Sequence, residues 1–221
     1  MHCCFCEEYQ NPLNNQYYHL LGKKIGIKDR KIKESTNWYA VPTIGCLTAG
    51  YMLLVCKQHY QSLANLNIDL YHEMLTLKSH LETIILEKLK RPCIAFEHGS
   101  TDSNYSGANS VEHVHLHILP YPETIWDNLH QKYHLTNFEL ISNYEELYQK
   151  WQINPPKSYL FFQDINNNIY YNPNAEEMPS QFFRKCLASY YKSDQWDWQK
   201  EYYVDNFLQT LECFQLPITN S

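Results

Sequence analysis

The 221-residue chain is long enough for one large domain or for a domain with a substantial extension. Hydrophobic residues make up 44% of it and charged residues 19%, which supports a packed core and excludes a disordered tail protein. The net charge of −6 argues against a surface for long nucleic acids, whereas a small phosphorylated ligand needs only a local positive field.

The N-terminal residues predict an intracellular, cytoplasmic protein that does not enter membranes. The opening MHCCFCEEYQ has no basic segment followed by an apolar one, and the longest apolar run, 49–56, is too short to span a bilayer. Eight cysteines in such a chain favour reduced thiols or metal ligands over disulfides. The spacing of Cys3 and Cys6 suits two ligands of one tetrahedral zinc ion, which needs two more; the alternative is an N-terminus with reduced thiols.

The first half of the chain combines short apolar segments with one long amphipathic segment. Residues 51–56 are apolar and indicate a buried strand. Apolar residues at helical spacing predict a helix that is capped by Asp69 and ends at Arg91. Residues 93–99 and 113–119 predict two further strands on either side of a polar loop.

After residue 121 the chain becomes rich in aromatic residues. The predicted elements are partly helical structure over 129–151, two strands over 158–171, and helices over 180–191 and 199–214. Ser180 is the expected N-cap of the first of these two helices. The aromatic side chains either form the core of a small subdomain or stack on a base or another subunit. Arg184 and Lys185 either lie on a solvated helix face or neutralise a phosphate.

The segment EHVHLHILP, residues 112–120, places a histidine at every second position. Because successive side chains of a strand point to opposite faces, His113, His115 and His117 are expected to share one face. The residues expected to face the core are Val114, Leu116 and Ile118. Such a row is either incidental on a half-exposed strand, a metal site, or an imidazole nucleophile held between polar neighbours.

At these residues the chain resembles the histidine triad (HIT) superfamily. HVHLHIL matches the pattern His-φ-His-φ-His-φ-φ, in which φ is an apolar residue, and the segments 50–66 and 95–99 resemble the flanking parts of the family. The resemblance covers about residues 3–120 and implies an α+β fold, with a five-stranded antiparallel sheet and a long helix, that is commonly dimeric. We therefore divide the chain into a HIT-like catalytic domain, 1–125, and an α+β extension packed on it, 126–221. The extension is partly similar to a bacterial HIT-like branch and to CwfJ-like proteins.

The resemblance also implies a reaction. The middle histidine, His115, attacks the α-phosphorus of a nucleotide to give a nucleotidyl-histidine, which water or another acceptor then releases. His117 donates a hydrogen bond to a phosphate oxygen. Ser110 and, more weakly, Asn109 match positions that contact the phosphate or the leaving group, although a loop serine can equally bond its own backbone. The expected partner is therefore a nucleotide or a nucleotide-like phosphorylated small molecule.

The chain departs from familiar HIT members at several positions. The acid that holds the ribose hydroxyls is missing near Thr43, and Tyr51 replaces a histidine. Glu97 and His98 stand where an Asn or Gln is usual. This pair either contacts the substrate and moves a proton to the leaving group, or lies at a solvated strand end. The departures weaken any expectation of adenosine specificity.

The resemblance also offers two further metal ligands. Some relatives use the histidine after the aliphatic strand and the first histidine of the triad, which here are His59 and His113. With Cys3 and Cys6 they would form a structural zinc site that joins the N-terminus to the triad strand. Two alternatives to the reaction through His115 remain: a non-catalytic nucleotide-binding or scaffold protein, and a metal-dependent hydrolase that uses the triad itself as ligands.

Overall fold

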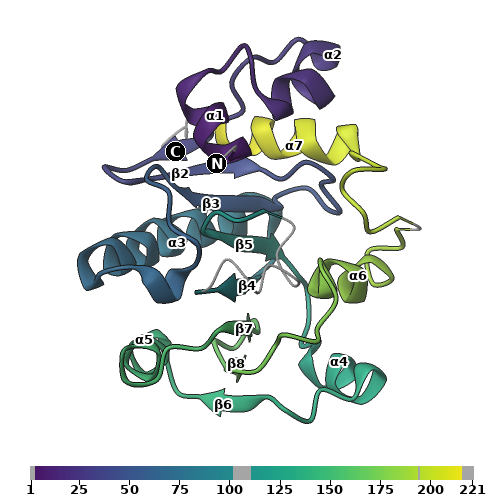
Figure 1. Cartoon of the computed structure of the whole chain (residues 1–221). Coiled ribbons are helices and arrows are strands. Elements are labelled where there is room, and N and C mark those ends of the chain that lie inside the picture. Colours follow the sequence, from purple (N-terminus) through teal and green to yellow (C-terminus); the bar gives the residue numbers. More distant parts are fainter. Residues whose placement is uncertain (1–2, 102–110, 194, 216–221) are drawn as a thin grey trace.

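The computed structural model describes residues 3–101, 111–193 and 195–215, and they form one antiparallel sheet with helices on both faces (Figure 1). The strands, in their spatial order, are β1 (Lys33–Glu34), β2 (Trp38–Pro42), β3 (Met52–Cys56), β5 (His115–Pro120), β4 (Cys93–Ser100), β7 (Ser158–Gln163), β8 (Ile169–Asn172) and β6 (Glu139–Ile141). The predicted α+β class with an antiparallel sheet is confirmed.

The sheet has eight strands where the sequence predicts five. The first five strands in spatial order all come from residues 33–120, as expected for the HIT-like part. The outer edge of β4 then pairs with β7, from Ala95 opposite Gln163 to Ser100 opposite Ser158. The extension thereby satisfies backbone groups that an edge strand would expose to solvent. The predicted boundary at residue 125 stays a prediction, because one sheet runs through both parts.

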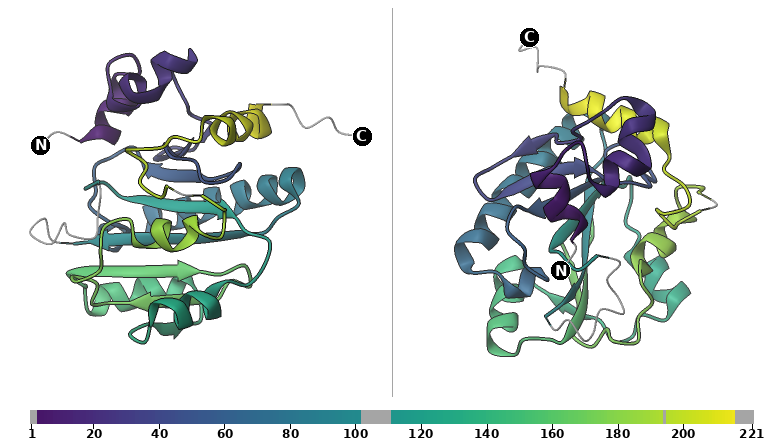
Figure 2. Two further views of the ribbon diagram at one scale, coloured as in Figure 1. Left: turned by 90° about the vertical axis from the view of Figure 1, so that its right-hand side faces the viewer. Right: turned by 45° about the horizontal axis from the view of Figure 1, so that its top comes forward.

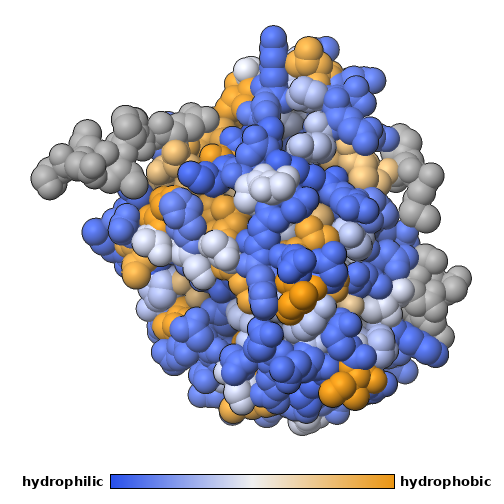
Figure 3. Space-filling model, turned by 90° about the vertical axis from the view of Figure 1, so that its left-hand side faces the viewer, coloured by the Kyte–Doolittle hydropathy of each residue, from blue (hydrophilic) through white to orange (hydrophobic). Residues whose placement is uncertain are grey.

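Helices α3 (Ile68–Leu89) and α5 (Tyr144–Ile153) cover one face of the sheet. The N-cap of α3 is Asn67, whose Oδ1 accepts from the N–H of Leu70 at 2.9 Å, so the prediction of Asp69 was wrong by two residues. The apolar stripe of α3 is buried against the sheet. The outer surface over these helices is mainly hydrophilic, with small apolar patches (Figure 3).

Helices α4 (Trp126–Tyr133) and α6 (Phe182–Ala188) cover the opposite face, where α6 crosses in front of the central strands (Figure 2). The ring of Trp126 stacks on Tyr170 with 3.9 Å between ring centroids, and Phe162 and Phe183 are fully buried on this face. Most aromatic residues of the extension therefore form a core. Helix α7 (Val204–Gln215) returns to the first half of the chain, where Thr210 accepts a hydrogen bond from the N–H of Gly50 at 2.8 Å.

The N-terminal segment lies beside α7, near β2 (Figure 2). It contains α1 (Cys4–Gln10) and a helical turn, Tyr18–Gly22, that continues into α2 (Lys23–Ile25). A further short turn, Leu63–Asn65, precedes α3. Among the described residues, every helix is too short or too polar to cross a membrane. The predicted homodimer stays a prediction.

Candidate active site and metal site

The last two histidines of the triad lie at the centre of the sheet. In β5, His115 is paired with Val55 of β3, and His117 lies between Leu53 of β3 and Phe96 of β4. The alternation predicted from the sequence is present, since Val114, Leu116 and Ile118 are buried on the α3 side. Both histidines are half-buried on the other side, with 5.0 Å between their ring centroids.

The ring of His115 is held in one tautomer by the backbone. Its Nδ1 lies 2.6 Å from the carbonyl oxygen of His113, so Nδ1 carries the proton and donates it. The lone pair is therefore on Nε2. Burial lowers the pKa of His115 below its ordinary value, and the bond to the carbonyl opposes this shift only in part. The ring is accordingly neutral at pH 7, with an unprotonated nitrogen in a cavity wall.

His117 has the opposite tautomer. Its Nδ1 lies 2.7 Å from the hydroxyl of Tyr51, and that hydroxyl has no other acceptor among the described residues. Because burial raises the pKa of Tyr51 to about 12, the hydroxyl keeps its proton and donates it to Nδ1. The proton of neutral His117 is then on Nε2, where it can be donated to a ligand. Burial, followed by the charges of His115 and Arg184, lowers the pKa of His117 well below its ordinary value.

The two histidines line an open cavity with a volume of about 730 Å³, which includes the space at its mouth. Its walls come from three parts of the chain. Apolar and aromatic side chains dominate, and they include Phe5, Tyr17, Ile44, Leu53, Phe96 and Trp198. The polar side chains on its walls include Glu8, Arg30, Thr43, His98, Gln181 and Arg184. Such a mixture suits a ligand with an apolar, flat part and a polar, charged part.

Glu97 and His98 do not act together, because consecutive residues of β4 point to opposite faces of the sheet. His98 lines the cavity, as the sequence suggested. Glu97 lies on the other face with only 2% of its surface exposed, where it accepts hydrogen bonds from the N–H of Leu63 and from the hydroxyl of Tyr159. Burial raises the pKa of Glu97 to about 8. The substrate contact suggested for Glu97 is therefore replaced by a structural role beneath α3.

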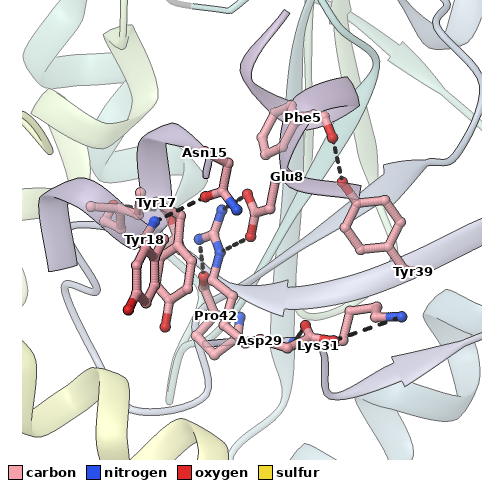
Figure 4. A network of polar contacts seen from close by, with 12 residues as sticks. Phe5, Glu8, Asn15, Tyr17, Tyr18, Asp29, Lys31, Tyr39 and Pro42 are labelled. Atoms are coloured by element: carbon pink, nitrogen blue, oxygen red, sulfur yellow. Dashed lines mark hydrogen bonds and ion pairs between the residues drawn. The ribbon is translucent and has the colours of Figure 1, made fainter. Parts of the chain in front are cut away.

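A buried ion pair fixes the N-terminal wall of the cavity (Figure 4). The guanidinium of Arg30 donates to both carboxylate oxygens of Glu8, at 2.6 and 2.7 Å, and its third nitrogen donates to the carbonyl of Pro42. The guanidinium also lies 4.8 Å from the ring centroid of Tyr17. This pair joins α1 to the end of β2. Sequence reasoning missed both residues, because nothing in their spacing reports a contact across 22 positions.

The four predicted metal ligands come together beside the cavity. The ligand atoms of Cys3, Cys6, His59 and His113 all lie within 4.8 Å of one another. The sulfur of Cys6 lies 3.6 Å from Nδ1 of His59 and 3.6 Å from Nδ1 of His113, and the sulfur of Cys3 lies 3.2 Å from the latter. Ligands at about 2.0–2.3 Å from one tetrahedral ion are separated by about 3.5 Å, so these residues fit such an ion.

Two details of this cluster support metal binding. Nε2 of His113 lies 2.7 Å from the carbonyl oxygen of Cys56, which places its proton there and leaves Nδ1 unprotonated toward the sulfurs. The rings of His59 and His113 lie 5.1 Å apart between centroids, and Nδ1 of each lies 3.6 Å from the sulfur of Cys6, so both imidazoles converge on one point. The remaining predicted site residues, Ser110 and Asn109, lie outside the described residues.

Comparison with known proteins identifies the central part of the chain. Residues 25–124 match the family model of the HIT domain. This segment is a HIT domain. Cys3, Cys6, Gln181 and Arg184 lie outside the HIT domain, although they lie beside its triad in space. The partial similarity of the extension to CwfJ-like proteins stays a prediction.

Several solved structures resemble the chain. A hypothetical histidine triad nucleotide-binding protein from Sulfolobus tokodaii has 17% identity and a TM-score of 0.41, over 55% of this chain and 70% of that protein. A HIT family protein from Bacillus subtilis has 18% identity and a TM-score of 0.41, over 54% and 73%. A zinc-bound histidine triad family protein from Mycobacterium smegmatis has 21% identity and a TM-score of 0.35, over 42% and 66%. No curated protein matches the chain.

Proposed function

We propose that this protein is an enzyme that cleaves a phosphoanhydride, phosphoester or phosphoramidate bond at the α-phosphate of a nucleotide, with His115 as the nucleophile. The observation that carries the proposal is the bond from Nδ1 of His115 to the carbonyl of His113, which leaves the lone pair on Nε2 in the cavity wall. A neutral imidazole with a fixed lone pair is a good nucleophile near pH 7.

The reaction would proceed in two displacements. Nε2 of His115 forms a bond to the α-phosphorus while the bond from phosphorus to the leaving oxygen or nitrogen breaks, and the leaving atom takes up a proton from solvent. Nε2–H of His117 donates to a non-bridging phosphate oxygen and stabilises the charge that develops there. Water or another acceptor then attacks the phosphorus, loses a proton, and releases the neutral imidazole of His115. Both hydrolysis and transfer are consistent with this chemistry.

We also propose that the Cys3, Cys6, His59 and His113 cluster holds a structural zinc ion. When bound, zinc would crosslink the two thiolates and the two imidazoles, and it would supply no reactive group to the reaction. The chain then keeps α1 beside the triad, where Phe5 packs 5.3 Å from the ring centroid of His115. The alternative of a hydrolase that binds its metal through all three triad histidines is not favoured, because Nδ1 of His113 faces the sulfurs of Cys3 and Cys6, and because the bond from Tyr51 to Nδ1 of His117 keeps the proton of His117 on Nε2.

The test uses nucleotides labelled at the α-phosphate. We expect wild-type protein to acquire an acid-labile label, and His115→Ala to lose the label and at least about 1,000-fold of turnover. His80→Ala, at an exposed histidine of α3, is the matched control and should behave as wild type. Full activity in His115→Ala would refute the mechanism. Nucleotide binding without label or turnover, across a panel of bases and leaving groups, would instead favour the non-catalytic alternative.

A further inference from the structure

We propose that Arg184 and Gln181, which lie at α6 of the C-terminal extension, complete the ligand site: Arg184 binds the phosphate of the ligand, and Gln181 accepts a hydrogen bond from its nucleoside part. The identification of this anion as a phosphate beside His115 rests on the function proposed above. Both side chains line the same cavity as His115 and His117. They come from a part of the chain that lies outside the HIT domain.

Arg184 is a buried cation without a counter-charge. Only 3% of its surface is exposed. Its Nη2 donates to the carbonyl of Gly45 at 2.8 Å and to that of Trp196 at 3.1 Å, and its Nε donates to Trp196 at 3.2 Å. Its Nη1 is enclosed and has no partner at hydrogen-bond distance, although the guanidinium interacts with the nearby hydroxyl of Tyr51. No acidic side chain among the described residues forms an ion pair with Arg184. A buried guanidinium in this state is stabilised when an anion enters the site.

Arg30, which lines the same cavity from the N-terminal part of the chain, provides an internal comparison. All three nitrogens of its guanidinium are used, and Glu8 neutralises its charge through two hydrogen bonds. The charge of Arg30 is therefore already compensated before an anionic ligand enters. Of the two arginines that line the cavity, only Arg184 has both an unused donor and an uncompensated charge.

The position of Arg184 connects it to the triad. Its guanidinium carbon lies 5.4 Å from the ring centroid of Tyr51, whose hydroxyl donates to His117. The charge of Arg184 contributes to the lowered pKa of His117, which agrees with a short separation. Gly45, with φ of +73°, allows this approach, because a Cβ there would lie 2.8 Å from Nη2 of Arg184. The HIT domain is thus shaped to receive this side chain from the extension.

Gln181 adds a hydrogen-bond acceptor to the same wall. The sequence predicts Ser180 as the N-cap of α6, but the helix begins after Gln181, which has the left-handed φ of 58° and does not cap the helix with its side chain. Its Nε2 donates to Asp197 at 3.3 Å, which fixes the orientation of the amide. Its Oε1 is enclosed and has no partner. An acceptor here suits a sugar hydroxyl or a base N–H, and it disfavours a second anionic group.

The experiment measures the affinity of the full chain for four nucleoside 5′-monophosphates, AMP, GMP, CMP and UMP, and for the matching nucleosides by calorimetry. For the monophosphate that binds best, we expect Arg184→Gln to raise Kd by about 10- to 100-fold and to leave the affinity for the nucleoside within about twofold. Lys185→Gln is the matched control, because it removes one positive charge from an exposed position of the same helix. It should bind as wild type does.

Circular dichroism establishes that each variant is folded. Arg184→Lys is the second variant: it keeps the charge but replaces the planar guanidinium with a single ammonium nitrogen, so a smaller loss of phosphate affinity is expected. Gln181→Leu should raise Kd for the nucleoside and Kd for the monophosphate by the same factor of about 3 to 10. The inference would be overturned if Arg184→Gln and Lys185→Gln bound the monophosphate with equal affinity. It would also be overturned if the wild-type protein bound no monophosphate more tightly than the matching nucleoside.

The outcome is separable from that of the proposed function. A loss of phosphate affinity in Arg184→Gln, together with no label on wild-type His115, sustains this inference and refutes the enzymatic proposal. Normal labelling of His115 with unchanged phosphate affinity in Arg184→Gln refutes this inference and leaves the enzymatic proposal intact.

Discussion

The substitution Glu97→Gln tests whether burial or hydrogen bonding controls the ionisation of this carboxyl. Two donors, the N–H of Leu63 and the hydroxyl of Tyr159, favour the carboxylate. Burial opposes them and dominates, so that the pKa of Glu97 rises from 4.5 to about 8. The folded protein should therefore hold one proton that the unfolded chain releases. Glutamine mimics this neutral form, because its oxygen accepts from Leu63 and its amide donates to Tyr159.

The sign of the pH dependence follows from this difference in bound protons. Below pH 4.5 both states of the wild type are protonated, and above pH 8 both are ionised. Between these values the unfolded state binds fewer protons, so the stability contributed by Glu97 falls as pH rises, by at most about 1.4 kcal/mol per unit. Integrated from pH 6.5 to pH 8, the loss relative to Glu97→Gln is roughly 1.5 kcal/mol. Glutamine does not titrate, so the variant lacks this slope.

Urea unfolding at pH 6.5, 7, 7.5 and 8 measures the effect, and the difference between the two proteins cancels the contribution of the histidines. We expect Glu97→Gln to gain roughly 1.5 kcal/mol over the wild type across this range. Glu87→Gln, at an exposed residue of α3, is the control and should follow the wild-type curve. Parallel curves for wild type and Glu97→Gln would refute the reasoning, since they would show that Glu97 is ionised in the folded protein. Nucleotide affinity should not change, because Glu97 does not line the cavity.

Two further predictions concern the N-terminal wall. Purified protein should contain about one zinc ion per chain. Cys6→Ser should lose this zinc and melt at a lower temperature, whereas Cys4→Ser, whose sulfur is outside the cluster, should keep it. An unchanged melting curve after metal removal would argue against a structural role. Glu8→Gln leaves the buried guanidinium of Arg30 without its counter-ion, and it should lower the free energy of unfolding measured in urea by about 3 kcal/mol. Glu87→Gln should show no such loss. Equal stability of the two variants would mean that the ion pair does not stabilise the fold.

Local patterns in the sequence determined much of this protein. The period-two alternation around His115 predicted which side chains face the core, and residues 69–91 predicted α3 to within a few positions, because both patterns depend only on backbone geometry. The HIT resemblance and the Cys3–Cys6 spacing predicted a four-residue metal cluster that the structure brings together. In each case the information lies within one short segment or in a motif.

Contacts between distant segments were decided only by the tertiary structure. The pairing of β7 with β4 turned an expected five-stranded sheet into one of eight strands, because an exposed strand edge accepts any strand that the chain can bring to it. Glu97 lies away from the cavity because the packing of the sheet decides which face of β4 borders the cavity, and Arg184 lies in the cavity wall because a helix 139 residues from Gly45 packs against that loop. Side-chain periodicity reports burial along one segment, but it does not report which segments meet, and the position of Arg184 in the same cavity as the triad depends on such a meeting.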